Sequence, residues 1–352
     1  MLRLWLCIAL AGALAACSTT GRELRRRGDE IMVAGRLFHT GAPVVLWTDP
    51  GGYDAYRTER RFVPWEDAAW AAGKGPESPN RFGIRKGLTP EQLEQVRGGG
   101  WDLPTLRSVV DQFVIHYDVC GVSRQCFRVL HDARGLSVHF MLDLDGTIYQ
   151  TLDVKERAWH AGAANDRSVG IEIANIGAYP PEGPAPDSPS RRREAGGRAT
   201  DDPPLPQTQP AATLPAMLSR WYSRDELGTR ITIPSTLGDG GIRTPNFTPR
   251  PARDQPITGP IHGATLTQFD LTPQQYRSLI RLTATLCRAL PKISCDYPRD
   301  DRGRLITTSL TESQLANYRG LLGHYHVTKG KIDPGPAFDW DRVVTGARAI
   351  MR

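Results

Sequence analysis

Short runs of alternating or continuous apolar residues mark the middle of the chain as rich in strands. The clearest runs are Asp111–Asp118, Leu136–Leu144, Thr147–Leu152 and Ser168–Asn175, with a shorter one at Val44–Trp47. Asp145 and Gly146 separate two of these runs, which predicts a β-hairpin. A further apolar run, Leu321–Val327, predicts a strand near the end of the chain with His324 at its middle.

Helical periodicity is clearest between Leu271 and Pro291. Thr272, Pro273 and Gln275 supply a helix start: a capping hydroxyl, a proline in the first turn and a glutamine that completes a capping box. Leucine and isoleucine then recur every three or four positions, so one face of this helix is predicted to be buried. Three shorter helices are predicted at Leu88–Val96, Ser123–Ala133 and Asp339–Arg348.

Strands and helices intermix along the chain, which predicts an α/β (α+β) fold with a single mixed β-sheet flanked by helices. The pattern breaks over residues 180–260, which hold 16 of the 28 prolines. We predict a Pro-rich insertion there, largely disordered up to about Ala212. Trp221, Tyr222 and Ile231–Ile233 indicate that its second half docks on another surface. The expected organisation is a signal segment over 1–16, an N-terminal extension over 17–104 and a main domain over 105–348.

The first residues have the pattern of an export signal. Arg3 is followed by the apolar run Leu4–Ala16, which is too short to span a bilayer. Leu14–Cys17 resembles the bacterial lipobox, so we expect Cys17 to be acylated and to anchor the protein in a membrane; an ordinary signal peptide cleaved nearby is the alternative. Ser18 stands where an aspartate would favour the inner membrane, so the expected location is the periplasmic face of the outer membrane.

Four cysteines follow the lipobox: Cys120, Cys126, Cys287 and Cys295. An even number of cysteines in an exported protein favours disulfide bonds. Three pairings are possible, and the two local bonds, Cys120–Cys126 and Cys287–Cys295, close the shortest loops. We predict these local bonds.

Composition narrows the range of partners. The net charge is +6 and the apolar content is 39%, which is below that of an ordinary globular domain. The basic residues are spread along the chain and form no basic helix, zinc-finger pattern or RNA-binding signature. Nucleic acid is therefore not an expected partner.

Two histidines and an aspartate stand out as candidate metal ligands. His116 lies near the end of one predicted strand and His324 lies on another, while Asp333 precedes Pro334, which holds it in an extended conformation at a turn. Imidazole and carboxylate groups suit Zn²⁺, and three protein ligands leave one tetrahedral position open for a water whose pKa zinc lowers to about 7. One catalytic zinc ion is therefore predicted. His326 would share a strand face with His324, but Asp333 is the expected third ligand because it approaches from another direction.

Other polar residues are candidates for the chemistry around such a metal. Glu172 is a charge in the middle of an apolar strand, which is costly without a function or a partner, and we assign it proton transfer. Lys331 is placed to stabilise an oxyanion by its charge. Three further histidines are weaker candidates for substrate contact or for support of the ligands, with packing as the alternative: His139, His160 and His326.

Five segments carry a resemblance to a known family: FVIHYD, LSVHFMLDLDGTIYQTLD, AWHAG, SVGIEIAN and GHYHVTKGKIDPGPAFDW. In this order they resemble the zinc-dependent N-acetylmuramoyl-L-alanine amidases, a superfamily that includes the peptidoglycan recognition proteins and the phage lysozyme amidases. The resemblance spans roughly residues 110–178 and 262–345.

The resemblance implies hydrolysis of the amide bond between N-acetylmuramic acid and L-alanine of the stem peptide, with peptidoglycan or muropeptides as partners. The metal ligands that it implies are His116, His324 and Asp333. It places the family's catalytic glutamate at Glu172 and its lysine at Lys331, and Cys120 and Cys126 resemble a disulfide of the peptidoglycan recognition branch.

Two other functions stay open. A non-catalytic peptidoglycan-binding lipoprotein would keep this fold without the metal. A lipoprotein scaffold would use the Pro-rich insertion to bind a partner enzyme. The complete ligand set, together with Glu172 and Lys331, favours the enzyme.

Overall fold

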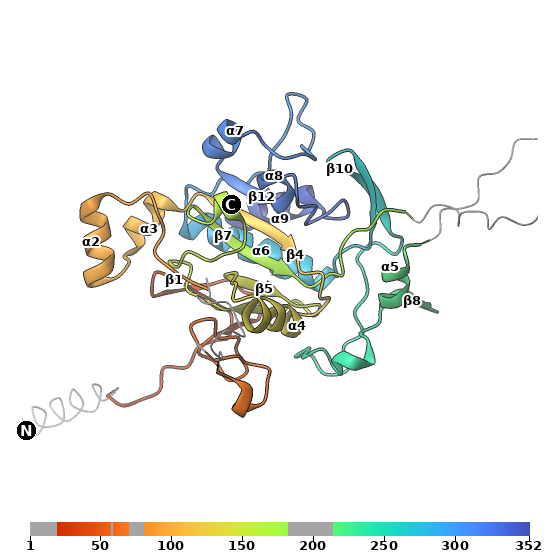
Figure 1. Ribbon diagram of the computed structural model, residues 1–352, viewed down its shortest axis with the longest axis horizontal. Coiled ribbons are helices and arrows are strands. Elements are labelled where there is room, and N and C mark those ends of the chain that lie inside the picture. Colours follow the sequence, from red (N-terminus) through yellow and green to blue (C-terminus); the bar gives the residue numbers. More distant parts are fainter. Residues whose placement is uncertain (1–19, 58, 70–80, 182–213) are drawn as a thin grey trace, which may run out of the picture.

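The computed structural model describes residues 20–57, 59–69, 81–181 and 214–352 (Figure 1). The predicted signal segment, the lipidation site Cys17 and the polar first half of the insertion lie outside the described residues, so these expectations remain predictions. Within the described part, no helix is both long enough and apolar enough to cross a bilayer.

A six-stranded mixed β-sheet forms the centre of the molecule, as predicted. Its strands are β3 (Val44–Leu46), β4 (Gln112–Tyr117), β5 (Phe140–Leu142), β6 (Ile148–Gln150), β7 (Ser168–Ile173) and β12 (Gly320–Gly323). Their order across the sheet is β12-β4-β7-β5-β6-β3. The first four run parallel, whereas β6 is antiparallel to β5 and parallel to β3. The predicted hairpin of β5 and β6 is present, with strands shorter than the apolar runs that carry them.

The two faces of the sheet pack into different cores. On β4, Phe113 and Ile115 belong to the main core. Because successive side chains on a strand point to opposite faces, His116 lies on the other face. On β7, Ile171 belongs to the main core as well, which puts Glu172 on the same face as His116. His116 and Glu172 are register partners on neighbouring strands, so the sheet sets the two polar groups side by side.

Two helices cover the main-core face, α6 (Pro273–Ala289) and α9 (Trp340–Met351), and they pack against each other (Figure 1). The predicted start of α6 is confirmed: Thr272 Oγ1 accepts the N–H of Gln275 at 3.0 Å, and Gln275 Oε1 accepts the N–H of Thr272 at 2.9 Å. The other predicted helices are also present, as α2 (Pro90–Gly99) and as α4 (Ser123–Phe127), which continues as the π-helix η2 (Arg128–Ala133).

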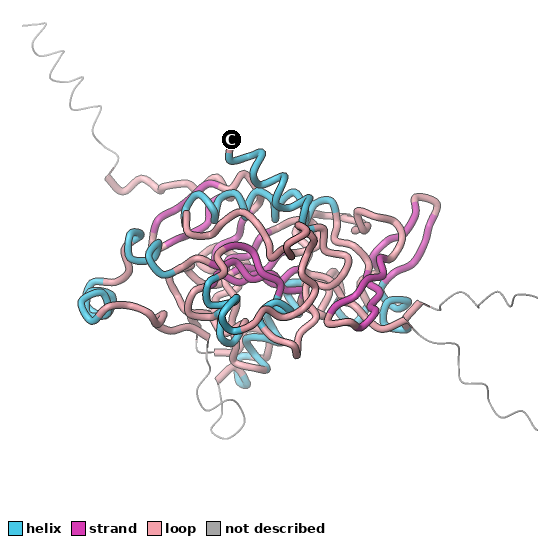
Figure 2. The backbone as a smooth tube through the Cα atoms, turned by 90° about the horizontal axis from the view of Figure 1, so that it is seen from above, coloured by secondary structure: helices cyan, strands magenta, loops and turns pink. Residues whose placement is uncertain are grey.

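Further short helices surround the sheet, which Figure 2 shows enclosed by helices and loops. They are η1 (Trp65–Asp67), α3 (Leu103–Val109), η3 (Gly162–Ala164), α5 (Ala216–Trp221), η4 (Ser235–Leu237), α7 (Glu312–Asn317) and α8 (His324–Val327).

The predicted strand Leu321–Val327 is wrong in its second half. β12 ends at Gly323, and His324 opens the helix α8 instead of lying in the middle of a strand. His324 and His326 therefore do not share a strand face. Nδ1 of His326 accepts the N–H of Gly323 at 2.8 Å, which stabilises the start of the helix. A short apolar run does not distinguish a buried strand from a buried helix. Here the hydrogen bond between the His326 ring and the Gly323 backbone favours the helix.

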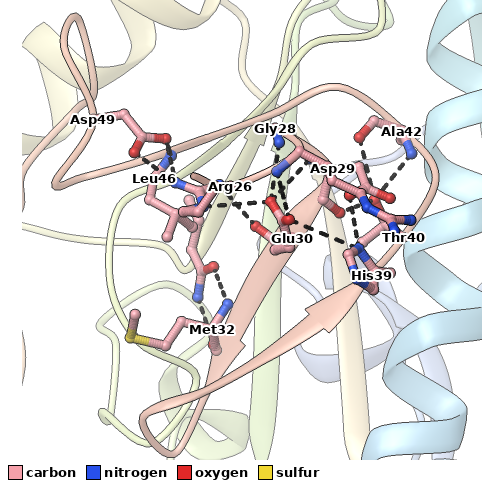
Figure 3. A network of polar contacts seen from close by, with 12 residues as sticks. Arg26, Gly28, Asp29, Glu30, Met32, His39, Thr40, Ala42, Leu46 and Asp49 are labelled. Atoms are coloured by element: carbon pink, nitrogen blue, oxygen red, sulfur yellow. Dashed lines mark hydrogen bonds and ion pairs between the residues drawn. The ribbon is translucent and has the colours of Figure 1, made fainter. Parts of the chain in front are cut away.

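The N-terminal extension is built into the main core. β1 (Glu30–Val33) and β2 (Arg36–His39) form a hairpin, and β3 adds an edge strand to the central sheet. In Figure 3 the buried carboxylate of Glu30 lies at the start of this hairpin, where it accepts three backbone N–H groups at 2.7–3.2 Å. Asp29 Oδ1 lies 2.8 Å from His39 Nδ1 across the same hairpin. These contacts stabilise the start of the hairpin.

The second half of the insertion docks on another surface, as its aromatic residues predicted, and that surface is the core. It contains a hairpin formed by β8 (Tyr222–Asp225) with β9 (Gly228–Ile231). A second hairpin, formed by β10 (Ile257–Ile261) with β11 (Ala264–Gln268), leads from the end of the insertion back into the main domain. Trp221, Tyr222 and Ile231 pack in one apolar cluster with Val122. The ring of Trp221 lies so close to Gly121 that a Cβ atom there would come within 2.5 Å of it.

Candidate active site

His116, His324 and Asp333 converge at the carboxyl end of the central strands. His116 is near the end of β4, His324 follows β12, and Asp333 lies in the turn after α8. Nδ1 of His116 lies 3.0 Å from Nδ1 of His324 and 2.8 Å from Oδ2 of Asp333. The distance from His324 Nδ1 to Asp333 Oδ2 is 3.1 Å. These groups meet because β12 and β4 are neighbouring parallel strands.

The triangle of donor atoms fits a zinc ion. Tetrahedral zinc with bonds of about 2.0–2.1 Å separates its ligand atoms by about 3.3–3.4 Å. The three atoms here are 2.8–3.1 Å apart, so a shift of a few tenths of an ångström would complete the geometry. Two imidazole nitrogens and one carboxylate oxygen are donors that zinc takes, and three such ligands leave a fourth position open.

Burial and neighbouring groups set the protonation states of the ligands. Burial, followed by the nearby His324, lowers the pKa of His116 to about 4. Burial acts to raise the pKa of Asp333, but hydrogen bonds with His116 and His324 outweigh it and hold this pKa well below its ordinary value. At neutral pH, His116 is therefore neutral and Asp333 is ionised, which are the forms that bind a metal.

The turn after α8 is held from two sides, which places Asp333. The backbone carbonyl of Asp333 accepts the N–H of Tyr325 at 3.1 Å. Gly323 allows Pro334 to approach, since a Cβ atom at Gly323 would lie 2.7 Å from the Pro334 ring. On the other side, Gln268 of β11 donates to the carbonyl of Pro334 at 3.0 Å.

His160 supports the ligand His116 from behind. Nε2 of His116 lies 3.0 Å from Nδ1 of His160, and Nε2 of His160 lies 3.2 Å from the hydroxyl of Ser168. If Nδ1 of His116 binds a metal, its proton is on Nε2, so His116 donates to His160 and His160 donates to Ser168. Partners of this kind fix the tautomer and the orientation of a ligand ring. Burial and then the neighbouring His116 lower the pKa of His160 well below its ordinary value, which keeps the ring neutral.

The other two candidate histidines use both ring nitrogens on the backbone. Nδ1 of His326 accepts from Gly323, and its Nε2 donates to the carbonyl of Ile306 at 2.7 Å. Nδ1 of His139 accepts the N–H of Gly170 at 3.1 Å, and its Nε2 lies 2.9 Å from the carbonyl of Glu156 and 3.1 Å from Nη2 of Arg85. Burial lowers the pKa of each to about 3. Neither ring has a nitrogen free for a metal, so the structure places both as packing and bracing residues.

Glu172 lies beside the ligands on β7. Its Oε2 atom is buried and has no hydrogen-bond partner within the described residues. Burial, followed by repulsion from Asp333, raises the pKa of Glu172 well above its ordinary value. A carboxylate with a buried, unpartnered oxygen and a raised pKa next to a metal site has the character of a general acid–base group. Lys331 is exposed and lines the same cavity.

The ligands and Glu172 line a cavity of ≈ 160 Å³. A second cavity of ≈ 270 Å³ adjoins it, so open space continues past the ligands. The residues that line both cavities are Tyr117, Val119, Lys331 and Asp333. Sequence reasoning missed several lining residues, among them Asp118, Arg134 and Trp159. Asp118, two positions after His116 at the same strand end, is the one that a local signal could have found.

The four cysteines of the core are free thiols in the structure, and they lie in the predicted pairs. A hydrogen bond with Cys120, together with burial, raises the pKa of the Cys126 thiol. Cys287 and Cys295 share a hydrogen bond of the same kind. Each thiol therefore contacts the partner predicted for it, and the two disulfide bonds stay predictions. Cys120 and Cys126 also line the cavity that holds the ligands.

Solved structures that align with this chain include two that are described as amidases. The crystal structure of a selenomethionine derivative of AmpD is 16% identical, with a TM-score of 0.31, and the alignment covers 79% of this chain and 96% of that chain. AmiD from E. coli, in complex with the substrate anhydro-N-acetylmuramic acid-L-Ala-D-gamma-Glu-L-Lys, is 15% identical, with a TM-score of 0.32 and coverage of 75% and 65%. The endolysin amidase LysCS from Clostridium intestinale is 14% identical, with a TM-score of 0.29 and coverage of 70% and 88%.

A similarity to a known family is found in the sequence. A search of curated proteins found no match. Residues 106–232 match the family model described as N-acetylmuramoyl-L-alanine amidase. The matched region includes His116, His160 and Glu172 and ends before His324 and Asp333, which the fold brings to the same point. Over residues 106–232 the chain is therefore similar to the N-acetylmuramoyl-L-alanine amidases.

Proposed function

We propose that the protein is a zinc-dependent peptidoglycan amidase that hydrolyses the amide bond between N-acetylmuramic acid and L-alanine of the stem peptide. The observation that carries this proposal is the meeting of three ligand atoms, at 2.8–3.1 Å from one another, in the cavity that Glu172 also lines with one buried carboxylate oxygen. The family match supports the reaction class. Peptidoglycan or released muropeptides are the proposed substrates.

One zinc ion would be held by His116, His324 and Asp333, whose donor types fit it. When bound, zinc supplies a water of lowered pKa and polarises the carbonyl of the scissile amide. The protein's part is to hold the ligands in place, which it does through the path from His116 to His160 and through the turn around Asp333.

Glu172 and Lys331 would carry the rest of the chemistry. Glu172 takes a proton from the attacking water on its carboxylate and passes it to the nitrogen of L-alanine as the C–N bond breaks, so the carboxylate is regenerated. Its buried position and raised pKa favour both steps, because the carboxylate holds the proton until the amine accepts it. Lys331 lines the cavity and stabilises the negative charge that develops on the carbonyl oxygen.

The experiment that tests this function combines metal analysis with product analysis. The purified chain should contain one zinc ion by elemental analysis and should release stem peptides that begin with L-alanine from purified sacculi, as detected by mass spectrometry. Chelation should abolish the release, and added zinc should restore it. Full activity in a preparation shown to be free of metal would refute the zinc mechanism. Binding to sacculi without cleavage, in a zinc-loaded protein, would instead favour the non-catalytic peptidoglycan-binding lipoprotein.

The proposed location is the periplasmic face of the outer membrane, with the chain anchored through a lipid on Cys17. The support is the lipobox-like run Leu14–Cys17. Cys17→Ser should release the protein into the soluble periplasmic fraction or leave it unprocessed. Membrane fractionation that does not change in this variant, with no mass of an attached lipid on the wild-type protein, would contradict the anchor.

A further inference from the structure

A buried arginine of the N-terminal extension closes the base of a loop next to the site. Arg85 is only 1% exposed. Its guanidinium group donates to five backbone carbonyls at 2.8–3.3 Å, those of Val154, Lys155, Asn165, Asp166 and Ser168. Val154 and Lys155 begin a loop that residues 165–168 end, and we call it the 154–168 loop. Arg85 therefore ties both ends of this loop together.

The 154–168 loop carries His160, and two of the residues held by Arg85 position this histidine. Asn165 Oδ1 accepts the N–H of His160 at 3.1 Å, and the hydroxyl of Ser168 contacts its Nε2 at 3.2 Å. Nδ1 of His160 in turn contacts Nε2 of His116 at 3.0 Å. A continuous path of polar contacts thus leads from Arg85 to the proposed zinc ligand His116.

The chemistry of the side chain explains why an arginine stands at this position. Burial of a charged group is costly unless its hydrogen bonds are satisfied. The planar guanidinium has five N–H donors in a fixed fork, so it can bind two chain segments at once, whereas the ammonium group of a lysine is a single point with three donors. Burial lowers the pKa of Arg85 to about 9, so the group is still charged at neutral pH.

Neighbours of Arg85 contact the same loop. The carbonyl of Gly83 accepts the N–H of Arg157 at 2.8 Å. Gly83 also packs on the ring of Trp159, since a Cβ atom there would lie 3.2 Å from it. Trp159 lines the cavity of the site. This segment precedes the family match, which begins at residue 106, so the support comes from outside the matched region.

We propose that Arg85 is a positioning residue for the zinc ligand His116, acting through the 154–168 loop and His160. The N-terminal extension then contributes to the active site by positioning one of its ligands. The inference rests on the proposed function, because it takes His116 as a metal ligand.

The test is a double-mutant cycle on zinc affinity, measured by competition with a chromophoric chelator on the full chain. Arg85→Lys keeps the positive charge but loses the planar guanidinium group that binds both ends of the loop. Arg85→Gln loses the charge as well. Each should weaken zinc binding about 10–100-fold, the usual effect of losing support behind a ligand. His160→Ala should weaken binding to a similar extent, and adding Arg85→Lys to His160→Ala should cause little further loss, because both act on one path. The matched control is Arg97→Gln, which changes an exposed arginine of the same extension and should leave zinc affinity unchanged.

A second readout separates positioning from general stability. Hydrogen exchange at the amides of His160 and Ala161 should accelerate in Arg85→Lys at a temperature where the protein is fully folded, while exchange in β4 stays as in the wild type. Unchanged zinc affinity in folded Arg85→Lys and Arg85→Gln, or effects that simply add to those of His160→Ala, would overturn the proposal. Failure of both Arg85 variants to fold would assign the residue to the fold as a whole and would overturn it too. Absence of zinc from the wild-type protein would instead refute the proposed function.

Discussion

Nε2 of His116 lies 3.0 Å from Nδ1 of His160, on the side of the ring away from the other ligand atoms. The contact uses the second nitrogen of His116, so the ring can present only Nδ1 to a metal. Since His160 belongs to a loop that follows β6, the orientation of the ligand depends on a part of the chain that contributes no ligand itself. The site is therefore a property of the sheet and of the loop packed behind it.

Glu172→Gln should separate catalysis from metal binding. Glutamine keeps the shape of the side chain but cannot take up the proton, so we expect kcat to fall about 10²–10⁴-fold with zinc content unchanged. Because the pKa of Glu172 is raised and the ionised form is the base, wild-type activity should fall as the pH drops through that raised pKa. Glu94→Gln, at an exposed position of α2, is the control and should leave kcat unchanged. If zinc is lost with the Glu172 carboxylate, this residue is a ligand and the assigned role is wrong.

Asp333→Ala should lose zinc, whereas His326→Ala should retain zinc and lose stability. Asp333→Ala removes one corner of the donor triangle, so zinc and activity should be lost together. His326→Ala leaves the N–H of Gly323 and the carbonyl of Ile306 unpaired, which should cost about 1–3 kcal/mol for each buried group while most of the zinc is retained. Elemental analysis and urea unfolding of both variants give the answer. A metal-free His326→Ala beside a zinc-loaded Asp333→Ala would reverse the assignment.

The proposed export of the protein predicts two disulfides, Cys120–Cys126 and Cys287–Cys295. In each pair one thiol is near enough to raise the pKa of the other, which favours these local bonds over crossed ones. Peptide mapping under non-reducing conditions, on protein isolated from the periplasm, should show both local bonds. Crossed pairs or four free thiols in that material would contradict the prediction.

His139 should make the fold sensitive to acid. Its pKa in the folded protein is about 3, lowered by burial and then by the charge of Arg85, and it is near 6.5 in the unfolded chain. The unfolded state therefore binds a proton between these values that the folded state does not, so stability falls as the pH drops below 6.5. Between pH 7 and pH 5 this contribution amounts to roughly 2 kcal/mol. His139→Asn keeps an acceptor for the N–H of Gly170 but does not titrate.

The measurement is urea unfolding of the wild type and of His139→Asn at both pH values. The variant should be less stable than the wild type at pH 7 because the carbonyl of Glu156 loses its donor. It should, however, lose less stability on going to pH 5. An equal loss of stability in both proteins would show that His139 is not the group that responds.

Local patterns in the sequence were sufficient for much of the fold. Apolar runs predicted the strands that became β4 and β7, and the capping residues Thr272 and Gln275 predicted the start of α6, because these signals act between residues close in the chain. The mixed sheet followed from the order of these elements. The same patterns, with the family resemblance, marked His116, Glu172, His324 and Asp333 as candidate residues, and the structure brings all four to one cavity.

Only the tertiary structure decided which segments far apart in the chain contact one another. Leu321–Val327 has no local signal for a helix, and α8 forms from His324 because His326 bonds back to Gly323 and onward to Ile306. Arg85 has no neighbour in the sequence that indicates its role, because its five carbonyl partners begin almost 70 residues later. Periodicity and capping report on the local chain, whereas the buried hydrogen bonds that orient a ligand depend on which strands and loops pack together.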